Sequence, residues 1–201
     1  MLLVFILSLI GFYISLSVHE ASHAFIAFRL GDPTSKIEGR MTLNPLAHID
    51  IIGTVLVPIF LIFSGIPAFG WAKPVMVDPR NFRSPVRDNF ITAIAGPLSN
   101  LVFAMLAAII LKFIPDTSAS FEFLAILVNI NVLLAVFNLI PIPPLDGSKV
   151  WHFILSDEAY FTLERMGPYI LLVILFFSYM TGNSFFNFIW AVANFLVNII
   201  V

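Results

Sequence analysis

The chain has 201 residues, of which 60% are hydrophobic and 11% are charged, and its mean hydropathy is +1.00. A soluble domain contains about 45–50% apolar residues, so the composition indicates a membrane protein with no room for a separate soluble domain. A net charge of −2 without charged clusters excludes a nucleic-acid-binding arm, and the lack of cysteine excludes disulfides, thiolate metal ligands and a cysteine nucleophile.

Apolar runs comparable with the roughly 20 residues that span a bilayer occur at six places along the chain. They lie at about residues 1–28, 51–66, 89–114, 121–140, 166–180 and 185–201. The sequence therefore predicts an all-α membrane protein, a bundle of about five to six transmembrane helices. We expect one domain over residues 1–201, with a core at 1–155 and a C-terminal helical hairpin at 160–201.

The first run carries His19, Glu20 and His23 in the pattern His-Glu-x-x-His. On a helix the two histidines lie about 6 Å apart along the axis and about 40° apart around it, so both can bind one metal ion. Glu20 lies roughly 100° around from His19, where its carboxylate can deprotonate a metal-bound water. The alternative is a pair of structural histidines bonded to backbone carbonyls. Each ionisable group costs about 2–3 kcal/mol or more in the membrane, which favours the metal site.

The second run, residues 51–66, is short for a span and contains Pro58. We expect it to form a re-entrant or β-hairpin segment between the first helix and the helix that carries Gly96 to Asn100. The connections at residues 29–50 and 71–88 hold seven of the ten basic residues, so the positive-inside rule places both on the cytoplasmic side. Residues 37–77 could also offer an edge strand to an unwound substrate.

A catalytic zinc takes three protein ligands and leaves a fourth position open, so the histidines need a partner. The candidates in or beside later runs are Asp116, Glu122, Asp146, His48 and His152. Asp146 is favoured, since three prolines end the helix before it and Gly147 frees the backbone after it. The alternative for Asp146 is a helix N-cap. Two crossings, by residues 89–114 and 121–140, return Asp146 to the membrane side of His23.

Three motifs in this order resemble the site-2 protease family of intramembrane zinc metalloproteases, peptidase family M50. They are His19-Glu20-Ala21-Ser22-His23, Gly96-Pro97-Leu98-Ser99-Asn100, and Asn138-Leu139-Ile140-Pro141-Ile142-Pro143-Pro144-Leu145-Asp146-Gly147. The resemblance implies one Zn2+ per chain on His19, His23 and Asp146, with Glu20 as general base. It adds Asn138 as a catalytic-site residue that binds substrate backbone or stabilises an oxyanion.

The stretches at residues 44–53 and 69–75 look like a compact prokaryotic branch of this family, without PDZ-like or CBS-like domains. For Asn100 the sequence leaves open whether the residue packs helices or takes part in catalysis. For His48 and His152 it leaves open whether they are structural or belong to the site. The expected reaction is hydrolysis of peptide bonds within or next to transmembrane segments of membrane-protein substrates. The expected location is a prokaryotic cell membrane, with the active site toward the cytoplasm and lipid around the chain.

Two alternatives come from other functional classes. The first is a metal transporter or channel, and the second is a catalytically silent protein that binds membrane clients. A transporter needs a polar path to the far face, but residues 1–14 and 102–111 are almost wholly apolar. A silent binding protein would not need Glu20, which is present. The substrate, the trigger for cleavage and a homo-oligomeric state are left open by the sequence.

Overall fold

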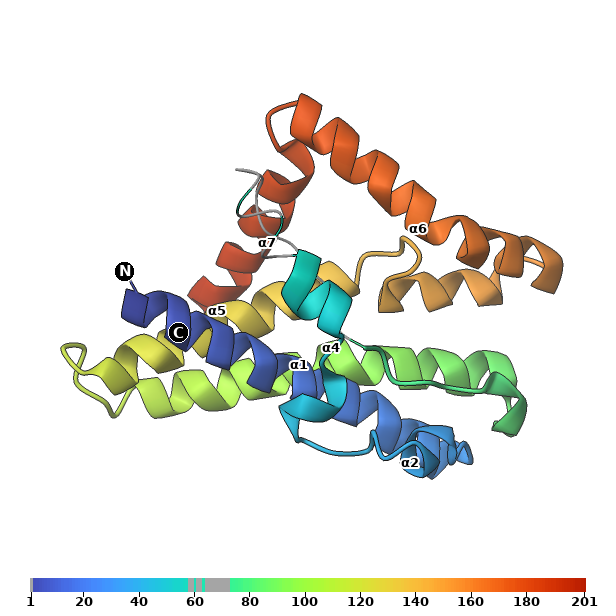
Figure 1. The fold of residues 1–201 in the computed structure, drawn as a ribbon, viewed down its shortest axis with the longest axis horizontal. Coiled ribbons are helices and arrows are strands. Elements are labelled where there is room, and N and C mark those ends of the chain that lie inside the picture. Colours follow the sequence, from blue (N-terminus) through green and yellow to red (C-terminus); the bar gives the residue numbers. More distant parts are fainter. Residues whose placement is uncertain (1, 58–59, 61–62, 64–72) are drawn as a thin grey trace.

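The structure is a computed structural model that describes residues 2–57, 60, 63 and 73–201. Five long helices dominate it (Figure 1), and no strand occurs among the described residues. They are α1 (Leu2–Leu30), α4 (Pro85–Leu111), α5 (Ala119–Asn138), α6 (Asp157–Met180) and α7 (Ser184–Ile200). The first four are long and apolar enough to cross a membrane, and α7 is an apolar helix of 17 residues. The predicted all-α membrane bundle is confirmed.

Short helical segments fill the connections between the long helices. They are α2 (Thr34–Ile37), the 3-10 helices η1 (Pro45–His48), η3 (Pro79–Asn81) and η4 (Asp146–Phe153), and the π-helix η2 (Ile51–Leu56). The run predicted to re-enter, residues 51–66, begins with η2, and its remainder includes residues 58–59, 61–62 and 64–66, which lie outside the described residues. Re-entry therefore stays a prediction.

Helices α1, α4 and α5 pack together, and α7 packs mainly against α5. The buried cluster between α4, α5 and α7 is rich in small side chains, with Ala104, Ala107 and Ala108 on α4 and Ala193 on α7. Lipid is as apolar as these side chains, so close backbone approach rather than a hydrophobic driving force holds such helices together. Alanine at these positions permits that approach.

Helix α6 is less tightly packed than the others and diverges from the bundle (Figure 1). Among the helices of the described residues, it packs mainly against α7 and η4. At Gly167 the helix passes so close to Pro143 that a Cβ atom would lie 2.5 Å from the proline Cβ. Lys149 Nζ also lies 2.6 Å from Glu164 Oε2. These contacts fix α6 beside the segment that carries Asp146.

Asp32 joins the connection after α1 to the connection before α4. Its Oδ1 accepts hydrogen bonds from the backbone and hydroxyl of Thr34 and from Asn81 Nδ2, and its Oδ2 accepts one from Asp78 N. Burial raises the pKa of the Asp32 carboxyl, but these hydrogen bonds outweigh burial and hold the pKa below its usual value. The carboxylate form is therefore the one that stabilises the fold.

We expect Asp32→Asn to lower the free energy of unfolding by about 1–3 kcal/mol at pH 7, because the amide cannot accept all four hydrogen bonds. A pKa depressed in the folded state contributes stability above the unfolded pKa of about 4, and this is lost as pH falls toward the folded value. The melting temperatures of wild type and variant in detergent should therefore converge below about pH 4. Exposed Asp116→Asn is the control, and an equal effect of both substitutions would contradict the role of Asp32.

Candidate metal centre

Three electron-pair donors from two distant parts of the chain meet between the helices. His19 and His23 lie one turn apart on α1, with their Nε2 atoms 3.0 Å apart. Asp146 Oδ2 lies 3.0 Å from His19 Nε2 and 3.4 Å from His23 Nε2. One ligand atom from each residue lies within 4.8 Å of the others, and both histidines are buried. The structure thus brings together the three residues predicted to bind metal.

A tightly folded connection brings Asp146 to the histidines. Helix α5 ends at Asn138, and Trp151 Nε1 donates a hydrogen bond back to Pro141 O at 2.7 Å. Gly147 lies so close to the end of α5 that a Cβ atom there would be 2.2 Å from Leu139 O. The N-cap of η4 is Leu145, so the alternative of Asp146 as a helix N-cap is wrong.

The hydrogen bonds of the two imidazoles determine which ring nitrogens carry protons. His23 Nδ1 lies 2.7 Å from Thr92 O, a carbonyl that can only accept. His19 Nδ1 lies 2.6 Å from Asn100 Oδ1, and the Asn100 amide nitrogen is already donating to Ser15 O. Both Nδ1 atoms are therefore donors, and both Nε2 atoms of the neutral rings present lone pairs.

Two imidazole lone pairs and a carboxylate oxygen thus converge with no proton to share between them. Asp146 Oδ2 is buried and receives no hydrogen bond among the described residues. Such a set repels itself unless a cation lies between its members, and two histidines with one carboxylate match a known ligand set of catalytic zinc. The residues present fit zinc.

Asn100, left open between packing and catalysis, contacts a candidate ligand directly. It lies on α4 and is fully buried. Its Nδ2 donates to Asn131 Oδ1 on α5 at 2.7 Å as well as to Ser15 O, so its Oδ1 must face His19. Asn131 Nδ2 in turn donates to Ser15 Oγ at 2.7 Å and to Leu127 O at 2.8 Å. This chain of oriented amides holds the His19 ring in one tautomer and one orientation.

The sequence analysis missed Asn131. The available signal was a polar amide in the middle of an apolar run, where an unsatisfied polar group is costly. The residue with which such a group pairs depends on how α5 is rotated against α4 and α1. That rotation is a property of the packed bundle.

We expect Asn131→Leu to raise the zinc dissociation constant about 10- to 100-fold. Leucine has a similar volume but removes one of the two acceptors that hold Asn100 Nδ2 away from His19, so the orientation of Asn100 is less firmly fixed. The measurement is competition for zinc with a chelating dye. Asn129→Leu is the matched control, since Asn129 is exposed on the same helix and, within the described part of the chain, its side chain bonds to Ala125 O alone. Equal affinity in both variants would contradict the positioning role.

Gly96 lies directly against the two imidazoles. A Cβ atom at this position would be 2.4 Å from His23 Nε2 and 2.7 Å from His19 Cε1. No side chain fits between α4 and the histidines at this level of the bundle. The glycine is therefore required by the close approach of the α4 backbone to the two rings.

Glu20 stands beside the three converging residues and is not one of them. Its Oε2 accepts a hydrogen bond from Val75 N at 2.8 Å, and the residue is 9% exposed. Glu20, His23 and Asp146 line one cavity of about 430 Å³, whose other walls come from residues 74–77, α4, η4 and α6. A carboxylate in this place can exchange a proton with a molecule in the cavity.

A larger cavity, of about 830 Å³, lies at the opposite end of α1 beside Ser8 and Glu122. Its lining includes neither the two α1 histidines nor Asp146. It therefore has no part in the chemistry considered for the smaller cavity.

Among the described residues, the Asn138 side chain has no hydrogen bond to the metal-binding residues, and its expected part in catalysis stays a prediction. Its Nδ2 donates to Leu134 O at 3.0 Å, and it is absent from the described lining of the cavity beside Glu20. His48 Nε2 bonds to Thr42 O at 3.0 Å, in agreement with the loop role weighed for it. His152 does line the cavity, where it stacks on Tyr160 and bonds to Asp157 Oδ1 at 2.9 Å.

Comparisons with known proteins give one consistent result. The model of Peptidase family M50 matches residues 7–120 and 114–182. The Putative zinc metalloprotease YwhC of Bacillus subtilis (strain 168) is 34% identical over 174 residues, which cover 81% of this chain and 76% of that protein. The Putative zinc metalloprotease Rip2 of Mycobacterium tuberculosis (strain ATCC 25618 / H37Rv) is 31% identical over 192 residues, which cover 93% of this chain and 73% of that protein. No solved structure matches.

Proposed function

Because this chain belongs to peptidase family M50, the family of the site-2 proteases, we propose that it hydrolyses peptide bonds within or next to transmembrane segments of membrane-protein substrates. The chain is a zinc metalloprotease, and four of its described helices are long and apolar enough to span a membrane. The observation that supports this proposal is the burial of His19, His23 and Glu20 on a membrane-spanning helix, with Asp146 half-buried beside them.

In the proposed site, His19, His23 and Asp146 hold the ion through Nε2, Nε2 and Oδ2. Zinc supplies a Lewis acid that activates water and polarises the scissile carbonyl. Glu20 takes the proton of the attacking water on Oε1, since Oε2 is engaged by Val75 N–H. It then passes that proton to the leaving amine nitrogen. Asn138 Nδ2 donates one hydrogen to Leu134 O, and the second hydrogen and Oδ1 are the groups with which it would bind substrate backbone or an oxyanion.

The dimensions of the cavity bear on the form of the substrate. The cavity volume of about 430 Å³ is comparable with that of one turn of a helix 10–12 Å across. The carbonyl groups of a substrate helix are bonded within that helix, so we infer that it unwinds before they reach the site. Residues 74–77, which have no regular secondary structure, line the cavity, and we infer that an unwound segment passes along them.

We also propose a prokaryotic cell membrane as the location, with the active site toward the cytoplasm. The histidines lie in the half of α1 that ends at Arg29, and the following connections carry most of the basic residues. The positive-inside rule places that end in the cytoplasm. The whole of residues 1–201 would form one protease domain, in which the α6–α7 hairpin extends a core made by the preceding helices.

Metal removal tests the proposed function. We expect a chelator to abolish cleavage of single-span substrates by purified protein in liposomes, because His19, His23 and Asp146 would then hold no ion to activate water. Equimolar zinc should restore cleavage. The melting temperature should also fall in the chelated protein, because zinc binds only the folded site.

Two results would contradict the proposal. Cleavage that continues after the zinc has been removed, as measured by metal analysis, would place the chemistry elsewhere. Zinc flux across the liposome membrane without cleavage of any substrate would favour a transporter.

A further inference from the structure

The three asparagines of helix α7 lie along one face of the helix. We call Asn187, Ala191, Asn194 and Asn198 the asparagine stripe, and all four are exposed. At 100° per residue they lie within about 60° of one another around the helix. Their successive spacings of four, three and four residues are those of a seam along which two helices pack with a small crossing angle.

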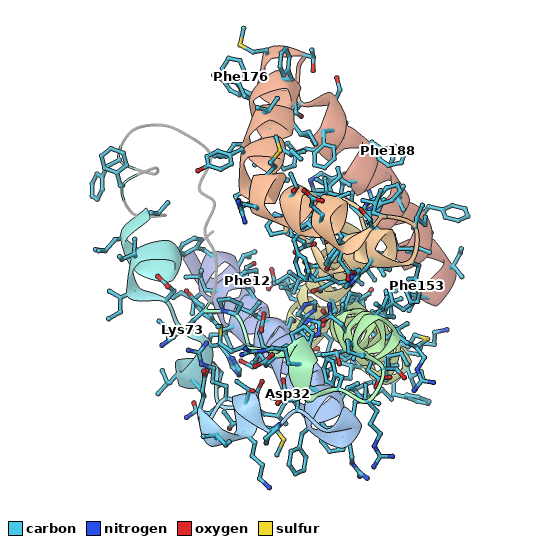
Figure 2. All side chains as sticks on the ribbon, turned by 90° about the vertical axis from the view of Figure 1, so that its right-hand side faces the viewer. Phe12, Asp32, Lys73, Phe153, Phe176 and Phe188 are labelled. Atoms are coloured by element: carbon cyan, nitrogen blue, oxygen red, sulfur yellow. The ribbon has the colours of Figure 1, made fainter. Side chains whose placement is uncertain are left out.

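The stripe faces away from the bundle. The core-facing side of α7 carries buried Ile189 and Ala193, with Leu196, Val197 and Ile200 packed against the core. The centre of the stripe lies about 150° around the helix from the centre of that side. Figure 2 shows α7 along one edge of the molecule, with labelled Phe188 on it.

The amides of the stripe have few partners in the chain itself. Asn187 Nδ2 donates to Gly182 O at 3.3 Å, within the turn before the helix. Among the described residues, neither Asn194 nor Asn198 has a side-chain hydrogen bond in the structure. Asn194 lies ten residues after the first residue of the 17-residue helix and six before the last, about 15 Å and about 9 Å along its axis.

A lone amide in contact with lipid is costly. Asparagine carries two donor hydrogens and an acceptor oxygen, and hydrocarbon satisfies none of them, at a cost of several kcal/mol for each polar group left without a partner. The rest of α7 is apolar and suited to lipid. The stripe is therefore matched to a polar partner and not to acyl chains.

We propose that the asparagine stripe is an interface at which α7 of a second copy of this chain packs in parallel. An amide is complementary to itself, since it donates and accepts. A two-fold axis along the membrane normal places each asparagine opposite its own counterpart, so the same register satisfies all three. A helix of another protein would need polar residues at the same spacings. Ala191 at the centre lets the two backbones approach closely.

This interface leaves the proposed site free. None of the described residues that line the cavity beside Glu20 belongs to α7. The two copies would therefore meet on a face from which neither one blocks the cavity of the other. The proposal stands independently of the substrate.

The absence of cysteine from the chain makes the interface directly testable. In liposomes at low protein-to-lipid ratio, mild oxidation of Ala191→Cys is expected to give a disulfide-linked dimer at least about tenfold faster than Phe188→Cys. Phe188 is 65% exposed and lies about 90° around α7 from the stripe centre, so it reports random collision. Equal rates for the two variants would overturn the proposal.

A second substitution tests the asparagines themselves. In the Ala191→Cys protein, Asn194→Leu is expected to slow cross-linking by roughly 3- to 30-fold, the range for an interhelical hydrogen bond in a membrane. Phe195→Leu, the neighbouring exposed position, is expected to leave the rate unchanged. Retained zinc binding shows that each variant is folded. Unchanged cross-linking in Asn194→Leu, or cross-linking to a co-reconstituted single-cysteine substrate helix in place of a second copy, would overturn the proposal.

Discussion

Glu20→Gln is expected to lower the rate of peptide-bond cleavage by about 10²–10⁴-fold, the usual contribution of a general base, and to leave zinc in place. Glutamine has the same size as glutamate and keeps an oxygen that can accept from Val75 N, which bonds to Glu20 Oε2 at 2.8 Å. It cannot take a proton from water. Glu20 is also outside the group of residues whose ligand atoms converge, so metal binding should be unaffected.

The measurement pairs the cleavage rate of a single-span substrate with the zinc content of the same preparation. Glu122→Gln is the matched control, since Glu122 lies in the first turn of α5 and lines the cavity at the opposite end of α1. It should change neither quantity. Loss of zinc in Glu20→Gln would mean that Glu20 is a ligand, and undiminished cleavage would mean that another group takes the proton.

The spans were predictable because lipid forces every backbone polar group to pair within its own segment, and only helices do so without a closed barrel. Boundaries were less predictable where polar residues begin a helix. Helix α6 begins at Asp157, nine residues before the apolar run expected at 166, because Ser156 caps it and accepts from Ala159 N. A hydropathy window does not register such a cap. The π-helix at Ile51–Leu56 was also not foreseen.

The candidate site was predictable to different degrees. The spacing of His19 and His23 places both on one face of their own helix, and α1 has that geometry. Asp146 was favoured because prolines precede it and Gly147 follows it, and the two crossings before it return the chain to the same side of the membrane. By contrast, the role expected for Asn138 stays a prediction, since its amide bonds to its own helix, and Asn131, which supports Asn100, was missed. A pattern in one helix specifies neighbours on that helix, but contacts between helices depend on their mutual rotation.

Gly96→Ala is expected to remove most of the zinc and to lower cleavage by at least about 100-fold, the effect of misplacing reacting groups by about 1 Å. The added methyl carbon would lie 2.4 Å from His23 Nε2 and 2.5 Å from His23 Cε1. Either the imidazoles turn away or α4 moves outward. Zinc tolerates changes of only about 0.2 Å in its ligand distances, so both adjustments disrupt the three-residue arrangement.

Gly11→Ala separates this effect from a general effect on helices. It is the same substitution in another membrane-spanning helix, but its Cβ would meet Leu127 Cδ2 at 3.4 Å, an ordinary contact. Alanine is favoured over glycine within a helix by about 0.5–1 kcal/mol, so neither variant should unfold for lack of helix propensity. Zinc content and melting temperature measured with excess chelator then decide the cause. If Gly96→Ala melts near wild type when both are chelated but binds little zinc, the methyl group acts on the imidazoles. If Gly96→Ala binds zinc as well as Gly11→Ala does, the inference that α4 closely approaches the histidines is wrong.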